Sequence, residues 1–144
     1  MRQCVGVRYT VQVPMRWSDM DAYGHVNNVV FLQYFEMARV DLFFERASLE
    51  ERTGLRRGTV VAAHDIEYKK PVVYSPRPLD VQIWVSDVRA AAFRCHYEVF
   101  DHDQLAVIGS TLLVPFDFSI NRPRRLTPDE KEFLARWNGE PAGG

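Results

Sequence analysis

The feature that most limits the fold is a long apolar helix, predicted directly after a loop rich in turn residues. Residues 29–46 contain neither proline nor glycine, and apolar side chains recur at helical spacing on nearly every side. Asn27 and Asn28 can accept hydrogen bonds from the first free amides, so the helix is expected to begin there. A helix that is apolar nearly all round is buried. The rest of the chain must therefore wrap around it.

The remaining sequence is dominated by strands. Alternating apolar and polar residues predict strands over 9–17, 60–68, 79–89, 93–100 and 105–118. The alternation gives each strand one apolar face, which we expect to cover the helix. Pro14 marks an edge or a bulge, and Pro71, Pro76 and Pro78 make the connection between the second and third strands a loop. The simplest arrangement is a meandering antiparallel sheet.

Two short helices are predicted besides the central one. Residues 48–54 combine a serine cap, early acidic residues and a terminal glycine. Thr127-Pro128-Asp129-Glu130 is a capping box with proline at the first helical position, which predicts a closing helix. We therefore expect one domain over residues 1–138 and a flexible C-terminal tail over 139–144.

Composition excludes several functional classes. The formal net charge of −1 lacks the basic excess of a nucleic-acid binder, and no apolar run is long enough to span a membrane. Cys4 and Cys95 are far apart and fit no metal-ligand spacing. These features predict a reduced, cytoplasmic protein with no metal, no cofactor, no nucleic-acid partner and no membrane partner.

Chemistry is expected where the helix begins. Free N–H groups and the positive end of the helix dipole favour negative charge there, including an oxygen that becomes anionic during a reaction. Asp21 precedes these amides by seven residues and could attack a carbonyl or activate a water molecule. The alternative is that Asp21 only closes a turn. Asp19 is expected to be a turn or salt-bridge residue.

A family resemblance rests on this same stretch. Asp21, Gly24-His25-Val26-Asn27-Asn28 and Tyr34-Phe35-Glu36-Met37-Ala38-Arg39 resemble the hot-dog-fold acyl-CoA thioesterases of the 4-hydroxybenzoyl-CoA thioesterase type. Plant acyl-carrier-protein thioesterases carry a similar stretch. The resemblance implies an α+β hot-dog fold, with about five antiparallel strands curved around one long helix. It also implies hydrolysis of an acyl thioester of coenzyme A or of acyl carrier protein.

The resemblance also implies roles for individual residues. Asp21 would be the catalytic carboxylate, the backbone N–H of Asn28 the oxyanion donor, and His25 a group that orients the thioester or shuttles a proton. Tyr23, Gly24 and Asn27 would contact substrate, although Tyr23 stands where the plant-type motif has an asparagine. The candidates for binding coenzyme A phosphates are Arg89, Arg94, Arg122, Arg124 and Arg125.

Hot-dog domains dimerise by joining their sheets, which implies a homodimer or homotetramer. The acyl site would then lie between the helix start of one subunit and a strand of the other. On the second predicted strand, His64 is expected on the same face as Val60, Ala62 and Ile66, because alternate residues of a strand share a face. His64 could therefore line the partner's site. The alternative for His64 is a core histidine with its hydrogen bonds satisfied.

Two further alternatives remain at this stage. Glu36 is a second candidate base, or it forms a structural ion pair with Arg39. A non-catalytic acyl-thioester binding protein would keep the same fold but lose the carboxylate at position 21, so the presence of Asp21 favours an enzyme. A hot-dog hydratase is disfavoured because its Asp/His pair belongs to a motif that this chain lacks.

Overall fold

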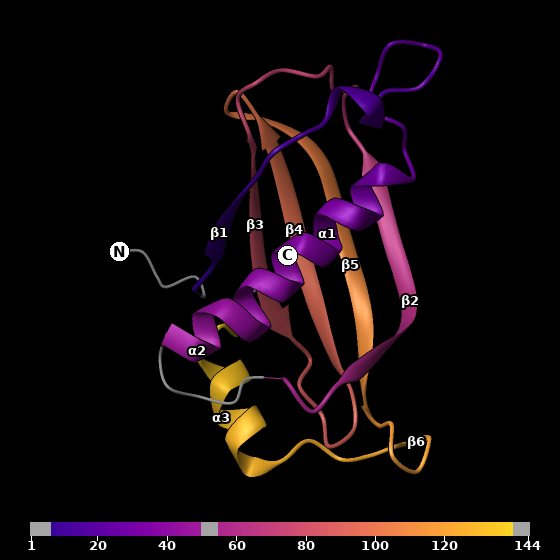
Figure 1. Cartoon of the computed structure of the whole chain (residues 1–144). Helices are drawn as coiled ribbons and strands as arrows, with labels where there is room; N and C mark the ends of the chain where they lie inside the picture. Colours follow the sequence, from indigo (N-terminus) through magenta and orange to yellow (C-terminus); the bar gives the residue numbers. More distant parts are fainter. Residues whose placement is uncertain (1–6, 50–54, 140–144) are drawn as a thin grey trace.

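A curved antiparallel sheet wraps around one long helix (Figure 1). The computed structural model describes residues 7–49 and 55–139. The strand order is β1-β3-β4-β5-β2, and the short β6 pairs with the end of β5. The strands are β1 Tyr9–Val13, β2 Thr59–Tyr68, β3 Leu79–Ser86, β4 Phe93–Asp101, β5 Gln104–Asp117 and β6 Arg122–Pro123. This arrangement confirms the predicted hot-dog fold.

The position of β2 differs from the predicted meander. Strands β3, β4 and β5 follow one another as expected, but β2 lies beyond β5 and pairs with it alone. The proline-containing loop of residues 69–78 carries the chain from that edge of the sheet back to β3, so the predicted loop is confirmed. One long side of β2 is therefore left without a strand partner in the part of the chain that the structure describes.

The central helix is continuous over three segments. Helix α1 (Val30–Val40) runs into a π-helical stretch, Asp41–Arg46, and then into α2 (Ala47–Leu49). Ser48 thus continues this helix, and the rest of the second helix predicted for 48–54 lies outside the described residues. No helix within residues 7–49 and 55–139 is long and apolar enough to cross a membrane.

The two helix starts fit the sequence signals in different ways. Helix α1 begins two residues later than predicted, because Asn27 accepts hydrogen bonds from the amides of Val29 and Val30. Helix α3 (Pro128–Arg136) begins with the predicted capping box, in which Thr127 and Glu130 each accept from the other's amide. The capping box predicted the start of its helix more accurately than the two asparagines did, because the box contains two reciprocal hydrogen bonds.

The helix packs on the apolar face of the sheet. Phe35 stacks on Tyr97 of β4 with 4.1 Å between ring centroids. A Cβ at Gly109 of β5 would lie 2.5 Å from the Phe35 ring, so glycine allows the helix to approach the sheet this closely. The opposite side of the helix is not covered. Met37, Val40 and Phe44 are 43%, 47% and 37% exposed, so the expectation of a helix buried all round is wrong for a single chain.

The alternation of apolar and polar residues predicted a solvent-exposed outer face of the sheet, but part of this face is buried. Trp84 and His96 lie on this face and are buried. The Arg8 guanidinium lies 3.8 Å from the Trp84 ring centroid, and Gly139 packs against the same ring. The amide of Gly139 donates to the carbonyl of Val85. Residues near both ends of the chain therefore cover this part of the sheet.

Candidate active site

Asp21 stands at the base of a small hairpin before the helix. Met20 and Val26 form an antiparallel bridge, and the Asp21 amide donates to the His25 carbonyl at 2.9 Å. Gly24 has φ of +77°, a conformation that favours glycine, and a Cβ there would meet nothing within 4 Å. The Asp21 Oδ1 accepts from the Tyr23 amide at 2.9 Å, so Asp21 does close the turn. Its Oδ2 accepts no hydrogen bond within the described ranges and remains available for chemistry.

Asp19 holds this loop in place. It is buried, and its carboxylate accepts hydrogen bonds from the Arg16 amide, the Arg16 guanidinium and the Tyr34 hydroxyl, the last at 2.7 Å. Burial raises the pKa of Asp19, but these hydrogen bonds and the charge of Arg16 outweigh burial and hold the pKa below its usual range. Because Tyr34 belongs to α1, Asp19 joins the loop to the helix. Asp19 is thus the salt-bridge residue that the sequence predicted.

The amide of Asn28 is free at the helix start. The Val29 amide is bonded to the Asn27 side chain, whereas the Asn28 N–H meets no acceptor among the residues described. The Asn28 carbonyl accepts from the Tyr68 hydroxyl at 2.7 Å, which joins the helix start to the end of β2. A free N–H at the positive end of a helix can stabilise an oxygen that becomes negative.

A cavity of about 280 Å³ opens beside this amide. Its surface is mainly apolar, and two lysines take part in it; its lining consists of His25, Val26, Asn28, Phe31, Tyr68, Lys69, Lys70, Pro71 and Val72. Lys69 pairs with Glu67 at 2.8 Å, and Lys70 Nζ donates to the Gln104 side chain at 2.7 Å. Burial raises the pKa of Tyr68. The cavity therefore combines a mainly apolar surface with the free Asn28 amide and two lysines that have polar partners.

The polar lining residues Tyr68, Lys69 and Lys70 were missed by the sequence analysis. Tyr68 is the last residue of the predicted second strand, and Lys69 and Lys70 follow it. Only the placement of β2 beyond β5 brings this strand end to the helix start, and a strand pattern carries no information on the order of strands in the sheet. The run of two lysines and a proline after the strand is the one signal that could have drawn attention to them.

The structure does not bring all predicted site residues together. Tyr23 and Gly24 are exposed at the hairpin tip, and neither they nor Asp21 and Asn27 line the cavity, which His25 and Asn28 do. Arg89 follows β3 at the end of the sheet where Leu113 of β5 lies. Tyr68 pairs with Val107 of β5, which lies toward the other end of the sheet. Within one chain, Arg89 is therefore remote from the Asn28 amide.

The other arginines proposed for phosphate binding have different surroundings. Arg124 is engaged by Glu130, with two hydrogen bonds at 2.8 and 2.9 Å, which makes it a structural residue. Arg94 donates to Ser110 on the outer face of the sheet. Arg122 and Arg125 are exposed beyond β5.

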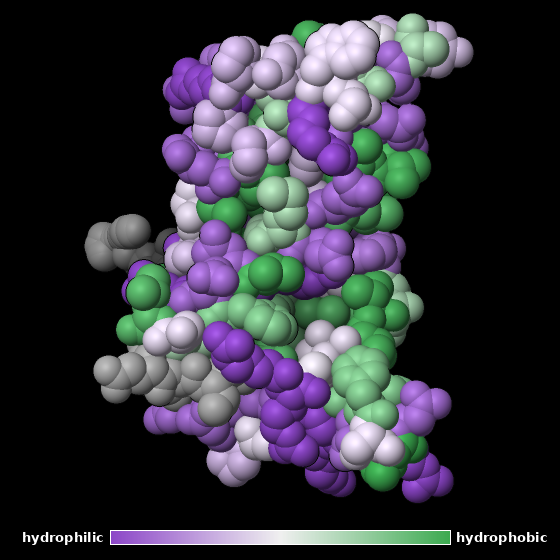
Figure 2. Space-filling model, in the orientation of Figure 1, coloured by the Kyte–Doolittle hydropathy of each residue, from purple (hydrophilic) through white to green (hydrophobic). Residues whose placement is uncertain are grey.

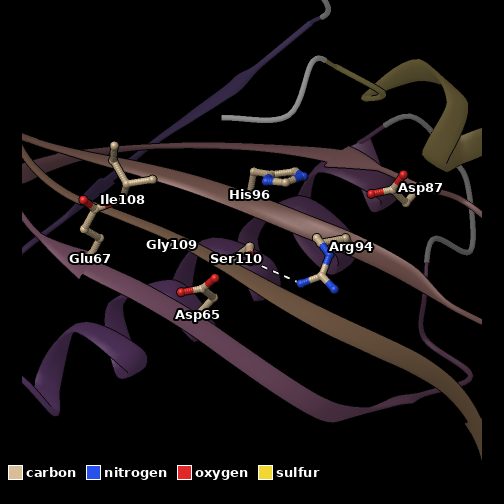
Figure 3. Close-up of a pocket in the computed structure, with 8 residues that line it drawn as sticks. All are labelled: Asp65, Glu67, Asp87, Arg94, His96, Ile108, Gly109 and Ser110. Atoms are coloured by element: carbon tan, nitrogen blue, oxygen red, sulfur yellow. Dashed lines mark hydrogen bonds between the residues drawn. The ribbon is translucent and has the colours of Figure 1, made fainter. Parts of the chain in front are cut away.

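A second cavity, of about 460 Å³, lies on the outer face of the sheet (Figure 3). In that view α1 lies behind the strands, so this cavity is separated from the Asn28 amide by the sheet. His96 and Asp87 line this cavity, and Ser86 Oγ, which does not line it, lies 2.6 Å from His96 Nε2 and 3.2 Å from Asp87 Oδ2.

His64 belongs to a hydrogen-bonded chain under the helix. His64 Nδ1 lies 2.9 Å from Thr111 Oγ1, which also accepts from the Tyr97 hydroxyl, and Tyr97 in turn accepts from Arg39 at 3.0 Å. Burial, and then the charge of Arg39, lower the pKa of His64. His64 thus has a hydrogen-bond partner, but its side chain is exposed within one chain and does not belong to the core.

A bulge changes the parity of β2. The register shifts between Val61 and Ala63, so His64 pairs with Thr111 on the helix side, whereas Val60 pairs with Val114 on the other side. The predicted shared parity of His64 and Val60 is therefore wrong. Val61, which pairs with Leu113, takes the helix-facing position instead.

Comparisons with known proteins agree with this fold. A thioesterase from Thermus thermophilus, solved in complex with coenzyme A and zinc, is 30% identical, covers 87% of this chain and 95% of its own, and superposes with a TM-score of 0.73. The DHNA-CoA thioesterase of Staphylococcus aureus is 26% identical over 90% of this chain and 89% of its own, with a TM-score of 0.75.

A curated relative is the uncharacterized protein YsmA of Bacillus subtilis (strain 168), which is 27% identical over 85% of this chain and 82% of its own length. The sequence profile of the Thioesterase-like superfamily matches residues 15–137, which include the Asp21 hairpin, the helix and the whole sheet from β2 to β5. The chain belongs to the Thioesterase-like superfamily.

Proposed function

We propose that this protein is an acyl-CoA thioesterase in which Asp21 is the nucleophile or general base and the Asn28 N–H is the oxyanion donor. The free Asn28 amide, which borders a cavity at the end of the Asp21 loop, is the observation that carries this proposal. Coenzyme A as the thiol is supported by the T. thermophilus complex and by the S. aureus enzyme. Acyl carrier protein is a second candidate carrier of the same thioester.

The chemistry needs one water molecule and no further reactant. Water activated by Asp21, or the Asp21 carboxylate itself, adds to the thioester carbonyl, whose oxygen becomes negative at the Asn28 N–H. The C–S bond then breaks, and the thiolate takes up a proton. If Asp21 was the nucleophile, water cleaves the resulting anhydride. His25, which lines the cavity, is positioned to orient the thioester or move the proton.

The proposed assembly is a dimer through β2. A strand with an unpaired edge tends to pair with another chain, and a two-fold axis pairs a strand antiparallel with its own copy. If the axis crosses the middle of β2, Tyr68 of one subunit lies opposite Thr59 of the other. Both helices then lie on the same face of the joined sheet, and the Asn28 cavity of one subunit faces the beginning of β2 in its partner.

The first prediction tests this assembly. Ala63 lies near the middle of β2, and lysine on an edge strand opposes pairing. We expect Ala63→Lys to shift the protein from dimer or tetramer to monomer in sedimentation, with turnover falling at least tenfold. Ala91→Lys, at an exposed turn, is the matched control and should change neither property. A fully active monomer would refute a site shared between subunits.

The second prediction tests the activity itself. We expect release of free thiol from a panel of acyl-CoAs that differ in chain length and polarity. The competing function is a non-catalytic acyl-thioester binding module, which the hydrogen bond from the Tyr23 amide to Asp21 favours because it gives one oxygen of that carboxylate a structural task. Acyl-CoA binding without thiol release from any member of the panel would establish the binding module.

A further inference from the structure

Arg39 is a half-buried cation without a carboxylate partner. It lies on α1 and donates from Nη1 to the Tyr97 hydroxyl at 3.0 Å. The ion pair predicted with Glu36 is not formed, and no carboxylate lies within 4.0 Å of Arg39 in residues 7–49 and 55–139. A guanidinium carries five N–H donors, so most of its hydrogen-bonding capacity is not used by these residues. Leaving a cation in this condition costs stability unless a ligand or partner completes it.

The charge of Arg39 acts on the groups around it. After burial, it is a cause of the lowered pKa of His64. It also opposes the rise in pKa that burial gives to Cys95 and Tyr97. These three side chains come from β2 and β4, so the positive potential extends over the helix-facing side of the sheet.

Arg39 borders a groove of about 220 Å³ between the helix and the beginning of β2. Apolar and polar side chains share the groove, and its lining consists of Glu36, Arg39, Val40, Phe43, Phe44, Thr59, Val61 and Leu113. In Figure 2 hydrophobic residues gather around a hollow in this region. The groove is thus lined by one cation, Arg39, and one anion, Glu36; a second cation, Arg56, lies 5.5 Å from the Phe44 ring centroid but does not line the groove. A groove with apolar side chains and a cation can hold an alkyl chain that ends in an anionic group.

We propose that Arg39 binds a carboxylate at the far end of the substrate's acyl group, so that the protein acts on monothioesters of dicarboxylic acids. This inference rests on the proposed function and on pairing through β2. That pairing brings the groove of one subunit to the Asn28 cavity of its partner. A thioester carbonyl at Asn28 then directs its acyl chain into the partner's groove, where the guanidinium supplies paired N–H donors that match a carboxylate.

Matched pairs of acyl-CoAs test the inference. Glutaryl-CoA is compared with pentanoyl-CoA, and adipoyl-CoA with hexanoyl-CoA, since each pair differs by the terminal carboxylate. We expect kcat/KM to favour the dicarboxylic thioester by about 10- to 100-fold, the range of a hydrogen bond to a charged group. Arg39→Met should abolish this preference by raising KM for the dicarboxylic thioesters, while the neutral thioesters change by less than about twofold. Arg39→Lys should retain part of the preference.

Arg56→Met is the matched control, because it removes a neighbouring cation that does not line the groove, and the variant should keep the wild-type preference for dicarboxylic thioesters. Binding of free adipate, measured by calorimetry, provides a readout that needs no turnover. If no acyl-CoA is hydrolysed, the proposed function fails, whereas adipate binding that is lost in Arg39→Met still supports the anion site.

Three results would overturn the inference. The first is equal kcat/KM for both members of each pair in the wild-type protein. The second is a preference, or adipate binding, that survives in Arg39→Met. The third is conversion of Arg39→Met to a monomer in sedimentation, which would show that Arg39 pairs with a carboxylate of the partner subunit.

Discussion

Turnover of the Asp21→Asn variant is expected to fall by on the order of 10² to 10⁴, the range for loss of a general base or nucleophile. Asparagine retains an oxygen at Oδ1, so the hydrogen bond from the Tyr23 amide and the hairpin turn persist. The melting temperature and the affinity for acyl-CoA should therefore stay close to those of the wild-type protein. Steady-state kinetics, thermal melts and calorimetry on the same preparations measure all three properties.

Glu36→Gln is the comparison that identifies the base. Glu36 is exposed, and its carboxylate accepts no hydrogen bond within the described part of the chain. The substitution should leave the melting temperature nearly unchanged, in contrast to the loss of stability that burial would have implied. Turnover should also be largely retained. If Glu36→Gln abolishes turnover while Asp21→Asn stays active, the base comes from the helix and the assignment of Asp21 is wrong.

Local patterns in the sequence predicted the elements well. The alternation of residues 79–86 and 93–101 and the capping box at Thr127 depend on neighbours within a few positions, and each is present in the structure. The link between Asp19 and Arg16 is equally local. Local periodicity fails where the register changes, as at the bulge between Val61 and Ala63, because one extra residue reverses the faces of the residues before it.

The candidate site depends on contacts that periodicity does not encode. Tyr68 reaches the Asn28 carbonyl because β2 is the last strand in the sheet, and no residue pattern specified that order. Arg39 prefers the Tyr97 hydroxyl to Glu36, although helical spacing would have allowed the ion pair. Helix periodicity also cannot tell whether an apolar side chain is covered by its own sheet or by a second subunit. The apolar side chains of Val40 and Phe44, which line the groove and are exposed in a single chain, are examples.

The largest loss of stability is expected for Arg124→Met. Arg124 donates two hydrogen bonds to the Glu130 carboxylate, and their side chains are only 9% and 1% exposed. Its guanidinium also donates to the carbonyls of Gly58 and Phe116, which joins α3 to the end of the β2–β5 pair where β2 begins. Removing one partner of a buried ion pair leaves an uncompensated charge and costs about 3–5 kcal/mol. For a chain of this size that corresponds to a fall in Tm on the order of 10 °C.

The pH dependence identifies the cause of this loss. Burial raises the pKa of Glu130, but the hydrogen bonds and charge of Arg124 and the Thr127 amide outweigh burial and hold the pKa below its usual range. The stabilisation by the pair is therefore complete above the ordinary glutamate pKa of about 4.3 and is lost as the pH falls through the lower folded-state pKa. Without Arg124, burial raises the Glu130 pKa, so protonation stabilises the variant. The difference in Tm between wild type and variant should narrow from pH 7 to pH 4.

Two further variants separate charge from packing. Arg125→Met removes an exposed neighbouring cation and should leave Tm within about 1 °C of the wild type, as expected for a surface substitution. Arg124→Met combined with Glu130→Met removes both charges and should recover much of the lost stability, because apolar side chains of similar volume often replace a buried pair without loss. A difference in Tm that stays constant with pH, or a double variant no more stable than Arg124→Met, would show that the loss comes from packing and from the bonds to Gly58 and Phe116.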